Sequence, residues 1–73
     1  MKRRFKTSEF DELLVIKGLD PTQLANRSGL SHVTIAKIRR GEPVTMSTVR
    51  KVAEVIAELP DLRPALELTE AVP

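Results

Sequence analysis

The side chains best suited to recognise another molecule lie between Ser31 and Gly41, where Ser31 is predicted to cap the start of a helix. Ile35 and Ile38 are three residues apart, so they share one face of this helix and must point to the core. At about 100° per residue, the opposite face carries short or basic side chains, namely Val33, Ala36, Lys37 and Arg40, with His32 one turn before Ala36. A slender, basic helix face of this kind suits the major groove of DNA, which is about 12 Å wide.

The same inventory of side chains argues against catalysis and metal binding. The chain has no cysteine and a single histidine, so it lacks the ligands for a structural zinc ion and the partners for a disulfide. No nucleophile is paired with a base, and Gly18, Gly29 and Gly41 stand singly at expected helix ends rather than in a phosphate-binding loop. We therefore expect neither enzymatic activity nor a cofactor.

Charge is distributed unevenly along the chain. Residues 1–51 hold eleven Lys and Arg against five Asp and Glu, a net charge of +6, whereas residues 52–73 hold one Arg against five acidic residues, a net charge of −4. The asymmetry suggests that the basic part faces nucleic acid while the acidic end is directed elsewhere. A solvated run of charges is the alternative interpretation.

The elements that must position the candidate helix follow from periodicity and helix-ending residues. With 73 residues the chain has room for one domain. Five helical segments and no extended alternating pattern predict an all-α fold, a compact five-helix bundle. We divide the chain into a basic N-terminal arm (1–7), a helical domain (8–70) and a frayed tail (71–73).

The first two helices carry start and stop signals. Ser8 and Asp11 have the spacing of a capping box, and this helix should bury Phe10, Leu13 and Leu14 and end at Gly18. In the next helix, Asp20 is the expected cap, with Pro21 in the first turn and Gln23 reaching back. That helix should end at Gly29, whose lack of a side chain permits a tight exit.

The later helices carry similar start and stop signals. Thr45 should cap a fourth helix whose apolar stripe is Met46, Val49, Val52, Ala53, Ile56 and Leu59. Pro60 closes this helix. A last short helix is expected from Asp61 or Leu62 to about Thr69, with Leu62, Leu66 and Leu68 packing back on the domain.

The stretch from Gln23 to Gly41 reads Gln-Leu-Ala-x-x-x-Gly-Leu-Ser-x-x-Thr-Ile-x-x-Ile-x-x-Gly. With it, residues 8–59 resemble the lambda repressor and Cro type of helix-turn-helix domain, and the short chain resembles a phage Cro or a small plasmid or prophage regulator. The resemblance implies a sequence-specific regulator of transcription, a Cro-like repressor that binds a palindromic operator in double-stranded DNA as a homodimer. Such a protein belongs in the bacterial cytoplasm or nucleoid.

The resemblance also implies roles for individual residues. The base-reading residues would be His32, Val33, Ala36 and Lys37. The phosphate-binding residues would be Thr22, Gln23, Thr34, Arg39, Arg40, Thr45 and Ser47. Two of these roles have simple alternatives, because Lys37 could be merely solvated and Val33 could pack against the preceding helix. The basic arm, Lys2 to Lys6, could lie along phosphates or in a minor groove, or be a disordered solubilising segment.

Two departures from the family are visible. Many members begin the second helix with a glutamine that grips phosphate, and Pro21 occupies that place here. Many members also pair an arginine in the first helix with a glutamate near the end of the third, where this chain has Leu14 and Arg39. Because both partners are replaced together, no buried charge is left without its counterion.

The acidic end supplies the expected dimer surface and the competing interpretation. The apolar residues proposed for dimerisation are Leu62, Leu66, Leu68 and Val72. Alternatively, the chain is a protein-binding module, such as an antitoxin or anti-activator, that holds a partner through residues 60–73. A regulatory protein partner is compatible with either. Because Leu13 to Ile16 is the longest strongly apolar run, we expect neither export nor membrane insertion.

Overall fold

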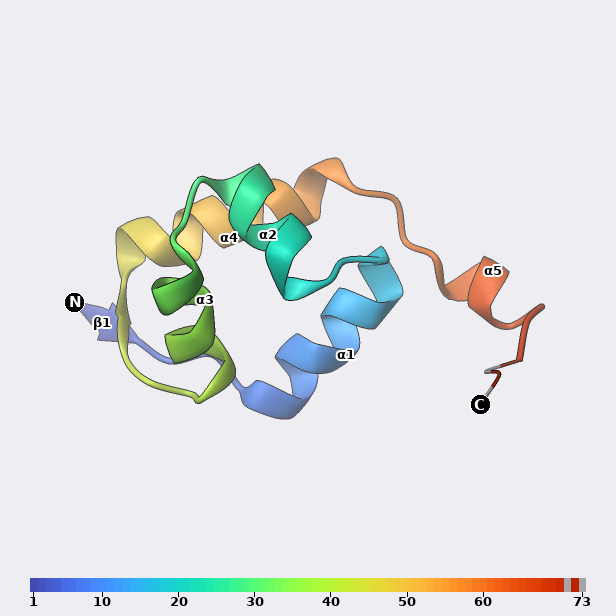
Figure 1. Ribbon diagram of the computed structural model, residues 1–73, viewed down its shortest axis with the longest axis horizontal. Coiled ribbons are helices and arrows are strands. Elements are labelled where there is room, and N and C mark those ends of the chain that lie inside the picture. Colours follow the sequence, from blue (N-terminus) through green and yellow to red (C-terminus); the bar gives the residue numbers. More distant parts are fainter. Residues whose placement is uncertain (71, 73) are drawn as a thin grey trace.

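Helices make up most of the chain in the computed structural model, which describes residues 1–70 and 72. In chain order the elements are β1 (Lys2–Arg3), α1 (Thr7–Lys17), α2 (Pro21–Ser28), α3 (His32–Arg39), β2 (Val44–Thr45), α4 (Met46–Glu58) and α5 (Arg63–Leu66). Helices α1 to α4 enclose one core, while α5 projects from one end of the molecule (Figure 1). The predicted all-α fold is confirmed, with one very small sheet added.

The turn between α2 and α3 forms as the sequence predicts. The Asp20 carboxylate accepts a hydrogen bond from the Gln23 amide at 2.7 Å, and the Gln23 side chain accepts one from the Asp20 amide at 3.0 Å. Gly29 ends α2 with a left-handed φ of 74°, a conformation that glycine adopts without steric cost. Ser31 then caps α3 by accepting a hydrogen bond from the Thr34 amide at 3.1 Å.

The predicted capping box at Ser8 and Asp11 is wrong. Helix α1 begins one residue earlier, at Thr7, and its N-cap Lys6 forms no side-chain capping hydrogen bond. The rings of Phe5 and Phe10 instead meet edge to face, with centroids 5.3 Å apart. This contact between the residue before the N-cap and the fourth helical residue is a hydrophobic staple, so apolar packing sets the start of α1.

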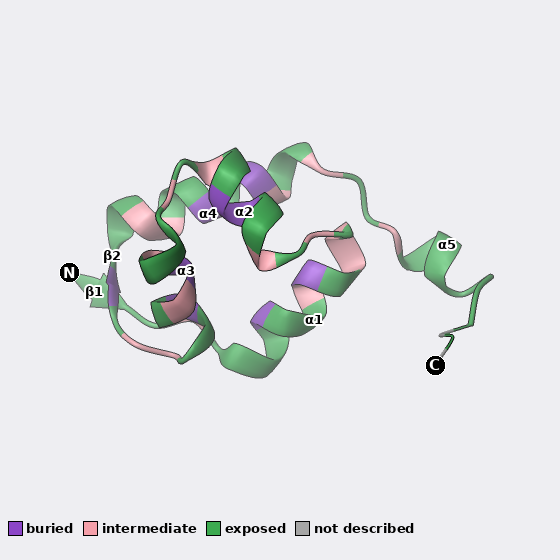
Figure 2. Cartoon of the chain, viewed as in Figure 1, coloured by how far each residue is buried: buried purple, intermediate pink, exposed green. Residues whose placement is uncertain are grey.

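The core lies where the four longer helices meet (purple in Figure 2). The most deeply buried side chains are Leu24 of α2 and Ile35 and Ile38 of α3, none more than 1% exposed. The remaining core side chains are Phe10, Leu14, Ala25, Val44, Val52 and Val55. Because both isoleucines of α3 are anchored in this core, the opposite side of that helix is held outward.

The apolar stripe predicted for α4 is correct for the residues around Val52 and wrong for Ala53 and Met46 at one side of it. Val52 and Val55 are buried, and Val49, Ile56 and Leu59 pack against them. Ala53 is exposed and Met46 is 39% exposed, because both lie about 100–120° around the helix from Val52. Val55 of α4 and Val44 just before the helix are also buried, although neither was predicted to be in the core.

The N-terminal arm is ordered. Strand β1 pairs antiparallel with β2, so that Lys2 lies opposite Thr45 and Arg3 lies opposite Val44. The interpretation of the arm as a disordered segment is therefore wrong for its first residues. The pairing brings the arm beside the start of α4 (Figures 1 and 2).

The C-terminal segment packs less than predicted. Helix α5 is only four residues long, and Leu62 alone of the three leucines is half-buried, with Leu66 40% and Leu68 88% exposed. Leu62 is held by its amide, which donates to the Ile16 carbonyl at 2.8 Å, and by its side chain, which covers Gly18. Beyond it the chain makes local contacts, as at Arg63, whose hydrogen bonds to Asp61 lower the pKa of that carboxyl group.

Of the predicted frayed tail, residues 71 and 73 lie outside the described residues, and Val72 is 88% exposed. No helix among the described residues is both long enough and apolar enough to cross a membrane.

Candidate nucleic-acid interface

The outer face of α3 presents the residues that the sequence analysis selected as base readers. His32, Val33 and Lys37 are exposed and Ala36 is half-buried. Val33 is 66% exposed, so the alternative that it packs against the preceding helix is wrong. An apolar side chain on this otherwise polar surface is available for contact with a ligand.

Helix α3 is held rigidly enough to present this face. It packs against α1 and α2, and its Ser31 cap satisfies one of the amides that a helix start leaves without an intrahelical acceptor. The Ser31 and Thr34 hydroxyl groups also lie within hydrogen-bond distance of each other, at 3.0 Å. The N-terminal turn, which includes His32 and Val33, is thereby fixed in position.

A polar pocket of about 170 Å³ opens beside α3 and joins three separate parts of the chain. It is lined by Lys2 of β1, Thr34 and Lys37 of α3, Pro43, and Val44, Thr45 and Thr48 around the start of α4. The structure therefore brings Thr34, Lys37 and Thr45, which were selected separately, to one place.

Thr48 was not predicted as a site residue, and Lys2 was predicted only as part of a basic arm, without its place beside Thr45. Lys2 reaches the pocket because it is the strand partner of Thr45. Thr48 lies there because its amide donates to the Thr45 hydroxyl at 3.4 Å in the capping turn of α4. The Thr45 capping signal could have indicated Thr48, whereas no local signal indicates a strand of two residues.

The chemistry of this pocket suits an anion. Two lysine ammonium groups and three threonine hydroxyl groups supply hydrogen-bond donors, and no acidic residue is among the lining residues. The amides at the start of α4 add a partial positive charge. A phosphate oxygen fits this donor set, because donors with positive charge make the stronger hydrogen bonds to phosphate.

The two arginines that follow Lys37 differ in their surroundings. Arg40 donates from Nε to the Glu42 carboxylate at 2.5 Å, so part of its charge is already balanced. Arg39 is exposed and forms no ion pair with any residue that the structure describes. Leu14, which stands where many family members have an arginine, is 5% exposed in the core, so nothing buried requires an acidic partner at Arg39.

Five of the seven predicted phosphate-binding residues lie outside the polar pocket, namely the two arginines just described and three residues at helix starts. Thr22 and Gln23 are exposed in the first turn of α2, where the Gln23 side-chain oxygen is already used in the capping box. Its amide nitrogen remains a possible donor. Ser47 is exposed in the first turn of α4. These residues are placed at two helix starts, where backbone amides point outward.

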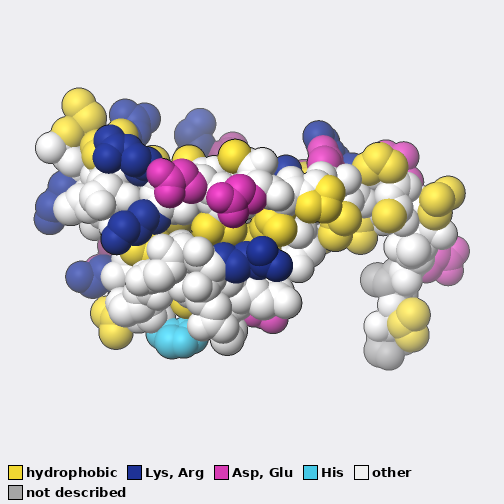
Figure 3. Space-filling view, turned by 90° about the horizontal axis from the view of Figure 1, so that it is seen from above, with side chains coloured by type: hydrophobic (Ala, Val, Ile, Leu, Met, Phe, Trp, Pro, Cys, Tyr) yellow, Lys and Arg dark blue, Asp and Glu magenta, His cyan; other side chains and the backbone are white. Residues whose placement is uncertain are grey.

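Basic and acidic side chains are separated from each other along the long axis of the molecule. Figure 3 shows most Lys and Arg side chains toward the end that carries β1, while hydrophobic and acidic side chains predominate toward α5. The arrangement in space thus follows the asymmetry in the sequence. No group of three or more potential metal ligands occurs among residues 1–70 and 72.

Comparison with known proteins identifies the middle of the chain. A family model described as Helix-turn-helix matches residues 12–61, which is more than half of the sequence. The matched region includes α2, α3 and α4 and excludes both β1 and α5. Searches of curated proteins and of solved structures found no match.

Proposed function

Because this chain belongs to the lambda repressor and Cro type of helix-turn-helix family, and is thus a DNA-binding regulator of transcription, we propose that it is a small Cro-like repressor. In this proposal it binds a palindromic operator as a homodimer in the bacterial cytoplasm. The observation that carries the proposal is the outer face of α3, where Val33 and Lys37 are exposed while Ile35 and Ile38 fix the helix in the core.

Base recognition is assigned to the N-terminal two turns of α3. Val33 offers a methyl surface to thymine, and Lys37 can donate to guanine O6 and N7. His32 can donate or accept, and the small side chain of Ala36 lets the helix approach the base edges. These four residues are exposed or half-buried on one side of the helix.

Phosphate binding is assigned to the residues that border this face. Thr34 and Thr45 contribute from the polar pocket, where Lys2 supplies an additional positive charge. Thr22, Gln23 and Ser47 contribute at the helix starts. Arg39 and Arg40 extend the basic surface, with Arg40 the weaker of the two because Glu42 already binds it. Such contacts fix the position of the protein on DNA without reading its sequence.

A palindromic operator requires two copies with their α3 helices about one DNA turn apart, roughly 34–36 Å. We assign dimerisation to the apolar residues Leu62, Leu66, Leu68 and Val72. Leu66, Leu68 and Val72 are exposed in the single chain, and each is available to a second copy.

One observation favours a second function, that of a protein-binding module. Leu66 and Leu68 are exposed beside Glu67 and Glu70 at the end of the molecule away from β1. Such a surface would hold a partner protein of a different kind, as in an antitoxin or anti-activator. Pro21 supports this alternative, since it provides neither the side chain nor the N–H of a phosphate-gripping glutamine.

Selection of bound sequences from a random duplex library tests the repressor proposal. The wild type is compared with Lys37→Ala and Arg40→Ala at about physiological salt, with Lys51→Ala as a control on an exposed lysine of α4 outside the polar pocket. We expect a palindromic consensus in which Lys37→Ala relaxes one position in each half-site. Arg40→Ala should weaken all sequences uniformly, and Lys51→Ala should leave the consensus unchanged.

The alternative predicts a different result. If no consensus emerges and the remaining binding disappears steeply with salt, the contacts are non-specific ones dominated by counterion release. That outcome would contradict the repressor proposal and favour the protein-binding module.

A further inference from the structure

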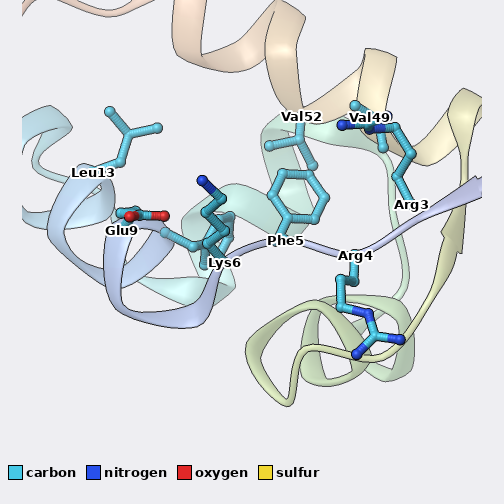
Figure 4. A pocket seen from close by; sticks show the side chains of 9 residues that line it. Arg3, Arg4, Phe5, Lys6, Glu9, Leu13, Val49 and Val52 are labelled. Carbon is cyan, nitrogen blue, oxygen red and sulfur yellow. The ribbon is translucent and has the colours of Figure 1, made fainter.

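An apolar groove of about 300 Å³ lies on the side of the domain where the N-terminal segment crosses between α1 and α4 (Figure 4). Its floor is made by Phe5, Phe10, Leu13, Val49 and Val52. Phe5 points toward Val52, so the groove is built on the hydrophobic staple that starts α1. Nothing in the described part of this single chain fills it.

The borders of the groove are mainly basic. Arg3 extends beside Val49, and Lys6 stands between Phe5 and Glu9 (Figure 4). Arg4 also lines the groove, although its side chain points away from α4. Two cations, Arg3 and Lys6, and one carboxylate, Glu9, therefore border the apolar floor. A complementary segment would carry apolar side chains flanked by acidic ones.

The C-terminal segment of the same chain has this composition. Residues 66–70 read Leu-Glu-Leu-Thr-Glu, and all five residues are exposed. Leu68 is 88% exposed, while Glu67 and Glu70 supply two negative charges beside the leucines. An exposed apolar segment and an empty apolar groove thus occur in one molecule with opposite charges around them.

We propose that the groove binds residues 66–70 of a second copy, and that the second copy binds the same segment of the first in return. Leu66 and Leu68 would enter the groove, with Glu67 and Glu70 beside Arg3 and Lys6. Reciprocal exchange closes the assembly as a two-fold symmetric dimer, whereas a one-way contact would continue into a chain of molecules. This inference rests on the proposed function only in taking the protein to be a homodimer.

The arrangement of the single chain favours a second copy over self-docking. Leu62 is fixed at the C-terminal end of α1, beside Ile16 and Gly18. From Leu62 the chain leads away from the domain through α5 (Figure 1). The six residues from Arg63 to Leu68 span at most about 20 Å, so the partner's groove must lie within this reach of Leu62.

Docking at this groove is compatible with DNA binding through α3. The groove is lined by the N-terminal segment, α1 and α4, and none of His32, Val33, Ala36 and Lys37 contributes to it. The exposed face of α3 is therefore still available when the groove is filled.

Intermolecular spin-label broadening tests the proposal, and the absence of cysteine permits a single label per chain. Chains without ¹⁵N that carry a nitroxide on Thr69→Cys are mixed with ¹⁵N-labelled wild-type chains. Only contacts between two copies can then broaden the observed amide signals. We expect broadening of the Phe5, Leu13 and Val49 amides that increases with protein concentration. Asn26→Cys, at an exposed position of α2, is the matched control and should not broaden these amides.

Any of three results would overturn the proposal. The first is the absence of broadening in the groove at concentrations where sedimentation detects a dimer. The second is the absence of any dimer at the highest concentration reached. The third is broadening that appears only when the label and ¹⁵N are in the same chain, which would mean that the segment binds its own groove. No DNA is present, so these outcomes are independent of the base-reading and phosphate-binding roles.

Charge reversal provides a second readout that does not alter the core. Arg3→Glu with Lys6→Glu should weaken dimerisation roughly tenfold, as should Glu67→Lys with Glu70→Lys. Combining all four substitutions should restore most of the lost affinity. Arg50→Glu with Lys51→Glu, on exposed residues of α4 outside the groove, is the control. Failure of the combined variant to recover would contradict the assigned pairing.

Discussion

At the scale of single residues, α3 separates side chains that hold the helix from side chains that it offers to a ligand. Ile35 and Ile38 are almost wholly buried, while Val33 is 66% exposed although it too is apolar. Exposing a valine gains nothing for the folded chain, since burial is what makes an apolar side chain stabilising. The exposure of Val33 therefore supports the base contact that we propose for it.

We predict that Val33→Ala affects recognition and not stability. The unfolding free energy should change by less than about 0.5 kcal/mol, because the side chain is largely exposed. Affinity for the selected operator should fall, and replacing the contacted thymine by uracil should weaken the wild type but not the variant. Binding isotherms on both DNAs measure this, and a further loss by the variant on uracil DNA would refute the thymine contact.

Lys2 provides a test of the polar pocket. Lys2→Ala should leave the preferred sequence unchanged and reduce the salt dependence of binding, with the slope of log affinity against log salt smaller by about one. The physical reason is the loss of one neutralised phosphate. Lys51→Ala serves as the control, because Lys51 is an exposed lysine that does not line the pocket. An altered consensus with Lys2→Ala would instead indicate contact with a base.

At the scale of elements, the helices differ in what fixes their starts. Side-chain caps begin α2, α3 and α4, whereas a contact between Phe5 and Phe10 begins α1. The capped start of α4 lies at the polar pocket, whereas the start of α1 lies at the apolar groove. The starts of α4 and α1 therefore have surroundings that match two different kinds of partner.

We expect substitutions at the two predicted capping boxes to have different effects. Asp20→Ala removes a cap that accepts a hydrogen bond at 2.7 Å, and it should cost about 1 kcal/mol of stability. Ser8→Ala removes an exposed hydroxyl that caps nothing, and it should cost almost nothing. Urea denaturation of both variants measures the difference. Equal losses would mean that Ser8 does cap α1.

At the scale of the whole molecule, the proposed DNA-binding and dimerisation surfaces lie toward opposite ends of an axis 40 Å long. The basic end contains β1, the polar pocket and the exposed face of α3, and the other end contains α5 with its exposed leucines. Acidic residues on the C-terminal segment are repelled by phosphate, so this end stays available for protein contact when DNA is bound.

Truncation after Leu62 tests this division. Residues 63–73 contribute no buried side chain among those described, so their removal should change the unfolding free energy of the monomer by less than about 0.5 kcal/mol. Dimerisation should be lost, and binding should be retained on a single half-site but weakened on the full palindrome. Sedimentation and binding to the two DNAs check this, and a dimeric truncated chain would place the interface elsewhere.

Local patterns in the sequence determined α2, the turn at Gly29, and α3 with its inner and outer faces. Asp20, Gly29 and Ser31 act within three or four residues of their own positions, so their effects are readable without knowing the rest of the fold. The match to the Helix-turn-helix family over residues 12–61 confirms this part of the interpretation. The base-reading and phosphate-binding roles remain predictions.

Tertiary structure decided what depends on contacts between distant residues. The pairing of Lys2 with Thr45 links residues 43 positions apart, and it creates the polar pocket and contributes to the apolar groove. Packing, not pattern, placed Val44 and Val55 in the core and left Ala53 and Leu68 outside it. Periodicity fixes which residues share a helix face, but only the neighbouring elements determine how far around the helix burial extends.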